Sequence, residues 1–114
     1  FHCALMQPAA DAMAEALATV ALKAPRVPLV ANVTAQAEAD PARITAQLVE
    51  QVTGRVRWRE SVAWMAAQGV TETWEIGAGK ALSGMVKRID RGIETRSIGT
   101  AAEVRAAAES LLNA

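Results

Sequence analysis

The side chains of this sequence that could do acid–base chemistry begin at its second residue. His2 is the only histidine among 114 residues, and histidine is the side chain that exchanges protons near neutral pH. As a general base it would need a hydroxyl or thiol nucleophile and an acceptor that orients its ring. The neighbouring thiol, Cys3, is poorly placed, because adjacent residues of a helix point about 100° apart.

We therefore interpret Cys3 as a small buried apolar side chain. The partner of His2 is then expected outside these residues, and the chain is predicted to be a piece of a larger protein. A passive terminal histidine is the alternative interpretation.

A glycine-rich turn, Gly77-Ala78-Gly79-Lys80, is the second candidate site, since it follows an expected strand and precedes an expected helix. A phosphate-binding P-loop needs a glycine five residues before the second glycine, and Ser or Thr after the lysine. Trp74 and Ala81 occupy those positions, so the motif fails. We predict that the glycines let the backbone turn sharply into the helix. A non-enzymatic α/β module that binds an anion at this helix start is the alternative.

A local basic group is formed by Lys87, Arg88, Arg91 and Arg96. Cations at a helix C-terminus complement the helix dipole, and such a group could also receive an acidic partner. Over the whole chain, 12 basic residues balance 12 acidic ones. No global field therefore draws the chain to nucleic acid or to a membrane.

Composition indicates one globular domain, with 52% hydrophobic and 21% charged residues. A single cysteine cannot form an internal disulfide, so a cytoplasmic location is expected. No apolar run reaches the roughly 18–20 residues that span a bilayer. We predict no cofactor and no metal ion.

Helices and short strands alternate along the expected fold. Helices are predicted over residues 4–22, 40–53, 57–68, 80–90 and 100–114, and strands over 27–33, 71–76 and 94–98. Asp40-Pro41 and the Thr100/Glu103 capping box give two of the helix starts. The alternation predicts an α/β fold, with a partial parallel sheet and flanking helices. Three strands are few for an open sheet covered on both faces.

Four segments, in this order, resemble the C-terminal part of the malonyl-CoA:acyl carrier protein transacylases of bacterial fatty acid synthesis. The segments are 1–10 (FHCALMQPAA), 27–33 (VPLVANV), 48–62 (with LVEQV, VRW and SV) and 74–89 (WEIGAGKALSGMVKRI). The resemblance covers essentially the whole chain. Ala78 stands where the family commonly has proline.

The resemblance implies that residues 1–114 are the C-terminal segment of an acyltransferase domain with an α/β-hydrolase-like large subdomain. The nucleophile-bearing N-terminal portion and the ferredoxin-like insertion would lie upstream. The missing portion would complete the central sheet, which accounts for the shortage of strands. This segment alone is expected to be inactive.

The family's mechanism implies roles for particular residues. A serine in a Gly-His-Ser-Leu-Gly elbow takes malonyl from malonyl-CoA and passes it to acyl carrier protein in a ping-pong reaction. His2 aligns with the base, and Gln51 aligns with the residue whose main-chain carbonyl holds the other imidazole nitrogen. Both are predicted catalytic residues, and the Phe1-His2 pair resembles one associated with malonyl selection.

The resemblance also implies the partners of the protein. They are malonyl-CoA, the upstream portion of the enzyme, and acyl carrier protein. The basic group of Lys87, Arg88, Arg91 and Arg96 is a candidate docking face for the carrier protein. The acyltransferase domain of a polyketide synthase shares much of this region and is the nearest alternative.

Overall fold

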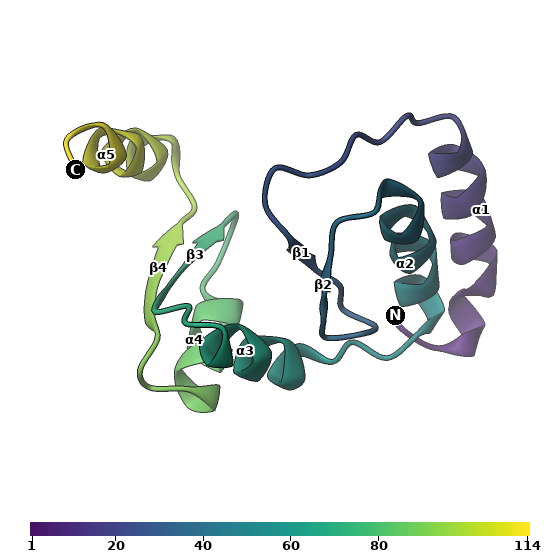
Figure 1. The fold of residues 1–114 in the computed structure, drawn as a ribbon, viewed down its shortest axis with the longest axis horizontal. Helices are drawn as coiled ribbons and strands as arrows, with labels where there is room; N and C mark the ends of the chain where they lie inside the picture. The colour runs from purple at the N-terminus through teal and green to yellow at the C-terminus, as the bar shows by residue number, and fades with distance from the viewer. The chain divides into compact units, whose positions relative to one another are not determined.

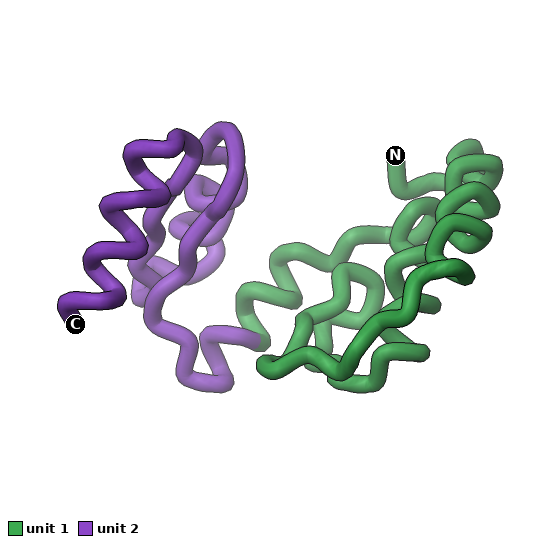
Figure 2. The backbone as a smooth tube through the Cα atoms, turned by 90° about the horizontal axis from the view of Figure 1, so that it is seen from above, with its two compact units in different colours: residues 1–64 green, residues 65–114 purple.

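The structure, a computed structural model, describes residues 1–114. They divide into two compact units, residues 1–64 and 65–114 (Figure 2). Helix α3, Trp58–Ala67, begins in the first unit and ends in the second. None of the helices has the length and apolar character needed to cross a membrane.

Two helices, α1 and α2, lie side by side in the first unit (Figure 1). The 3-10 turn η1, Ala4–Met6, leads into α1, Gln7–Ala18, whose second position is Pro8. Proline is tolerated there because the N–H groups of a first turn have no partner within the helix. Helix α2, Pro41–Thr53, begins as predicted, with the Asp40 carboxylate accepting a hydrogen bond from Ala42 N.

The first helix ends earlier than residue 22. Thr19 N and Val20 N donate to carbonyls three residues back, and the Thr19 hydroxyl donates to the Ala16 carbonyl at 2.8 Å. These bonds tighten the last turn and satisfy a carbonyl that a continuing helix would use. Two β-branched residues in succession also weaken the tendency to continue as a helix.

The strand predicted over residues 27–33 was also wrong, and it differs more from the structure than the helix end does. Only β1, Leu29–Val30, is extended, and it pairs antiparallel with the unexpected strand β2, Ala37–Glu38. Pro28 lacks the N–H that a ladder needs. A tight turn follows, in which Ala35 N donates to the Ala31 carbonyl and Ala35 has a positive φ of 54°.

The second unit is a β-α-β arrangement with a further helix. Strands β3, Glu72–Ile76, and β4, Glu94–Ile98, are parallel, and α4, Ala81–Ile89, connects them. Helix α5, Ala101–Leu112, follows β4. These bounds agree with the predicted ones within two residues, and the small parallel sheet with flanking helices confirms the predicted fold class.

Helices α4 and α5 each contact β4, through side chains that point to opposite faces of the strand. The Ser97 hydroxyl lies 3.2 Å from the Ser83 hydroxyl of α4, whereas Arg96 donates to the Ser110 hydroxyl of α5 at 3.2 Å. Successive residues of a strand face opposite sides. Helices α4 and α5 therefore flank opposite faces of the strand pair. Buried apolar side chains of this unit are Val86, Ile93, Ile98 and Ala107.

Candidate functional site

The His2 imidazole is anchored at the C-terminal end of α2. Its Nδ1 lies 2.6 Å from the Gln51 carbonyl oxygen, and its main-chain N–H donates to the Val52 carbonyl at 3.0 Å. The last carbonyls of a helix have no partner within the helix, so α2 offers acceptors at this point. The positive φ of His2, 60°, gives the residue a backbone conformation that L-residues rarely adopt, and such conformations cluster at functional sites.

This contact fixes which imidazole nitrogen can act as a base. A carbonyl oxygen only accepts hydrogen bonds, so Nδ1 must carry a proton, and Nε2 of the neutral ring is then the acceptor. The C-terminal end of a helix carries a partial negative charge. This charge and the Gln51 carbonyl therefore stabilise the imidazolium that forms when Nε2 takes a proton. His2 is exposed, which leaves the ring accessible to a nucleophile.

Gln51 makes a second contact that sequence reasoning missed. Its side-chain Oε1 accepts a hydrogen bond at 2.7 Å from Nδ2 of Asn32, the second residue after β1. The Asn32 carbonyl in turn accepts from Arg57 N at 2.8 Å. Asn32 lies in the VPLVANV segment, which is one of the four that carry the family resemblance. Its place in that segment was the only sign in the sequence that Asn32 could matter.

A hollow of about 210 Å³ lies beside this contact, between β1 and α2. Asn32 and Gln51 line it together with Gln47, whose Oε1 is buried without a hydrogen-bond partner. The nitrogen of that amide, Nε2, donates to Glu38 at 3.2 Å. Arg43 also donates to Glu38, and this bond is the main cause of the lowered pKa of the Glu38 carboxyl.

Cys3 is not buried, which corrects the sequence interpretation. The thiol is free and exposed. Cys3 has an extended backbone at the start of η1, with φ −145° and ψ 167°, and no residue of η1 is buried either. No hydrogen bond joins it to His2, so the adjacent pair does not form a nucleophile–base couple.

The glycine-rich turn adopts the conformation that its glycines predict. Gly77 and Gly79 have φ values of 137° and 88°, in the region that favours glycine. The chain passes close to itself here, since a Cβ placed on Gly99 would lie 2.8 Å from the Gly77 carbonyl oxygen.

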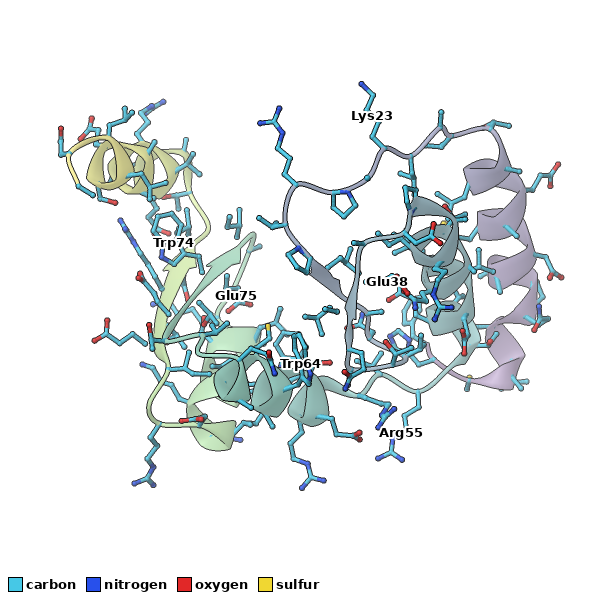
Figure 3. All side chains as sticks on the ribbon, in the orientation of Figure 1. Lys23, Glu38, Arg55, Trp64, Trp74 and Glu75 are labelled. Carbon is cyan, nitrogen blue, oxygen red and sulfur yellow. The ribbon has the colours of Figure 1, made fainter.

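The start of α4 already holds a negative charge from the chain itself. The Glu75 carboxylate accepts from Ser83 N at 2.8 Å and from Leu82 N at 3.2 Å. The bond from Ser83 is the main cause of the lowered pKa of Glu75. In Figure 3, Glu75 lies on the α4 side of β3, and Trp74 lies on the α5 side. An external anion would have to compete with Glu75, which argues against an anion-binding module.

The four residues of the basic group do not all come together. Lys87 and Arg91 line one hollow of about 570 Å³, together with Ile93, Glu94 and Thr95. Arg96 instead lies 5.0 Å from the centroid of the Trp74 ring, a cation–π contact, and is tied to α5 through Ser110. Arg88 lies in the last turn of α4 and is not among the residues that line the hollow. No cluster of three or more His, Cys, Asp or Glu side chains could hold a metal ion.

The known proteins to which this chain is similar are acyltransferases. No family model matches the chain. The malonyl CoA-acyl carrier protein transacylase of Salmonella typhimurium is 44% identical over 106 residues, which are 93% of this chain and 34% of that protein. The corresponding enzyme of Bacillus subtilis is 38% identical over 111 residues, 97% of this chain and 35% of that protein.

Solved structures give the same result. The crystal structure of the acyl-carrier-protein S-malonyltransferase of Bartonella henselae is 55% identical, with a TM-score of 0.87, and the match covers 97% of this chain and 35% of that one. A malonyl-transacylase in complex with its type II polyketide synthase acyl-carrier protein is 38% identical, with a TM-score of 0.83 and coverages of 96% and 35%.

More particularly, the chain is homologous over nearly its whole length to a part of the malonyl CoA-acyl carrier protein transacylases. The resemblance predicted from the sequence is thereby confirmed. The chain spans about a third of the length of these relatives.

Proposed function

We propose that the protein containing residues 1–114 transfers malonyl from malonyl-CoA to acyl carrier protein. Residues 1–114 would be the C-terminal segment of its acyltransferase domain, with the nucleophile-bearing portion and the ferredoxin-like insertion upstream. The identity of 55% to a solved S-malonyltransferase supports this proposal. The single, exposed Cys3 supports a cytoplasmic location.

The observation that carries the proposal is the 2.6 Å contact between His2 Nδ1 and the Gln51 carbonyl. With Nδ1 protonated and held, Nε2 takes the proton of a serine hydroxyl as its oxygen attacks the malonyl thioester carbonyl. The carbon–sulfur bond of the resulting tetrahedral intermediate then breaks. The coenzyme A thiolate leaves with the proton from the imidazolium, and malonyl-serine remains.

The second half of the reaction reverses these proton transfers. Nε2 takes the proton of the phosphopantetheine thiol of the carrier protein, and the thiolate attacks the serine ester. The serine oxygen leaves with the proton that the imidazolium returns. The ring is neutral after each half-reaction, so the catalyst is regenerated without another co-reactant.

Replacing His2 by alanine in the enzyme that contains this segment tests the proposed base. We expect malonyl transfer to fall roughly 10²–10⁴-fold, which is the range for a positioned general base. The matched control is Cys3→Ala, which removes the neighbouring thiol and is expected to leave transfer unchanged. Transfer at the wild-type rate by His2→Ala, or its loss in Cys3→Ala alone, would refute the assignment.

Acyl carrier protein would dock at the hollow lined by Lys87 and Arg91, with Arg88 beside it in the last turn of α4. Arg96 is a weaker candidate, since Trp74 and Ser110 already engage it. One solved relative is a complex with a polyketide synthase carrier protein. Rates of malonyl transfer to a carrier protein of fatty acid synthesis and to one of polyketide synthesis would therefore show in which of the two pathways the enzyme acts.

A further inference from the structure

We propose that Asn32 is a positioning residue for the base, acting through Gln51 on the His2 ring. The inference rests on the proposed role of His2 as general base. Asn32 would touch neither substrate nor the reacting atoms. Its effect would be to hold the carbonyl that selects the protonated nitrogen of the imidazole.

Gln51 contacts both Asn32 and His2, the first through its side chain and the second through its main-chain carbonyl. Asn32 Nδ2 donates to the Gln51 side chain at 2.7 Å, and the Gln51 main-chain oxygen lies 2.6 Å from His2 Nδ1. Exchanging O and N in both amides leaves an N–H···O bond between them, so the contact does not depend on how the amides are oriented. Gln51 is thus restrained at its side chain while its carbonyl meets the ring.

Gln51 needs such a restraint because it lies in the last turn of α2, which ends at Thr53. Carbonyls in a last turn lack the helical donor that would fix their direction, and helix ends are where a structure opens locally. Asn32 is itself fixed, since its carbonyl accepts from Arg57 N at 2.8 Å. Both amides are half-buried in the wall of the 210 Å³ hollow, where a hydrogen bond meets less competition from water.

The turn around Asn32 does not need its side chain. Residues 31–36 are closed by main-chain bonds, from Ala31 N to the Gln36 carbonyl and from Ala35 N to the Ala31 carbonyl. The side-chain amide is therefore available for Gln51. Removing it should leave the turn intact and release only the Gln51 side chain.

The tautomer of His2 can be measured directly. Heteronuclear NMR of the imidazole nitrogens in the enzyme that contains this segment reports it, because the signals of His2 are those missing from the spectrum of His2→Ala. We expect the Nδ1–H tautomer in the wild type and a mixture of both tautomers in Asn32→Ala. Gln51→Ala keeps the main-chain carbonyl but loses the side chain, so it should give the same mixture. The double variant should add nothing further.

Gln36→Ala is the control, because it removes an exposed amide from the same loop. In the enzyme that contains this segment, Asn32→Ala and Gln51→Ala should each lower kcat about fivefold, the effect of one lost hydrogen bond, and leave KM for malonyl-CoA unchanged. The pH profile of kcat should shift in both variants and not in Gln36→Ala.

Three results would overturn the proposal. They are an unchanged tautomer in both variants, a normal pH profile despite lost activity, and equal effects in Gln36→Ala. If Asn32→Ala fails to fold, Gln51→Ala alone decides the question. Failure of the proposed function has a different signature: the wild-type enzyme would not transfer malonyl, or His2→Ala would transfer it at the wild-type rate, whatever the NMR spectra of the Asn32 and Gln51 variants show.

Discussion

At the scale of single residues, the site depends on one helix end more than on any sequence motif. His2 and Gln51 are 49 residues apart, and no spacing rule predicts their contact. The family resemblance predicted the pair. Asn32 was missed, because an amide–amide contact over 19 residues leaves no local pattern. The exposure of Cys3 was also missed, because cysteine is a residue type that is usually buried.

The exposed thiol of Cys3 gives a prediction at this scale. As the only cysteine of the chain, it should be labelled completely by a maleimide in the native 114-residue chain, at a rate close to that in denaturing urea, because accessibility controls thiol reactivity. The Cys3→Ser chain gives the background. Labelling that requires urea would support the buried interpretation made from the sequence.

At the scale of elements, the second unit was predicted well because its signals are local. Gly77 and Gly79 mark the turn into α4, and the Thr100 hydroxyl accepts from Glu103 N at 3.2 Å as the capping box predicts. The Glu103 carboxylate accepts from Gly99 N rather than from Thr100 N. The antiparallel pair β1–β2 was not predictable, since it depends on an alanine, Ala35, in a left-handed conformation. Nothing in the residue type signals that turn.

The carboxylate of Glu75 makes the stability of the second unit depend on pH. Its pKa is lowered from an ordinary value of 4.5, chiefly by the hydrogen bond from Ser83 N. The stabilisation is therefore present above the unfolded pKa and is lost as the pH falls through the lower folded value. Glu75→Gln should be less stable than wild type at about pH 7, and the difference should shrink towards about pH 3.

Urea unfolding of both chains at the two pH values measures that difference. Glu94→Gln is the control, because the Glu94 side chain accepts no hydrogen bond and lies at the start of β4. A deficit of Glu75→Gln that is equal at both pH values would show that the carboxylate charge is not the cause.

At the scale of the whole molecule, the chain exposes much apolar surface. Phe1 and Ile76 are 94% and 75% exposed, and the parallel sheet contains only β3 and β4. Two strands are marginal as a sheet in water, and exposed apolar patches usually mark surfaces that another part covers. Both features support the proposal that an upstream portion of the enzyme completes this domain.

Carrier-protein docking is the prediction that belongs to this scale. Reversing the charge in Lys87→Glu or Arg91→Glu should raise KM for acyl carrier protein about tenfold and leave KM for malonyl-CoA unchanged, because charges of an interface act mainly on association with that partner. The effect should weaken as salt is added. Lys23→Glu, in the first unit, is the matched control. Equal effects of all three variants would point to net charge and not to a docking surface.

The acceptor that holds His2 has a consequence for how this site tolerates genetic change. It is a main-chain oxygen, so no codon change at position 51 can delete it, and even proline would retain it. A carboxylate in the same role could be lost in one mutation, and it would add its own titration to that of the ring. Here the acceptor does not ionise, so acidification does not remove it, and the identity of residue 51 matters only through the side-chain bond to Asn32.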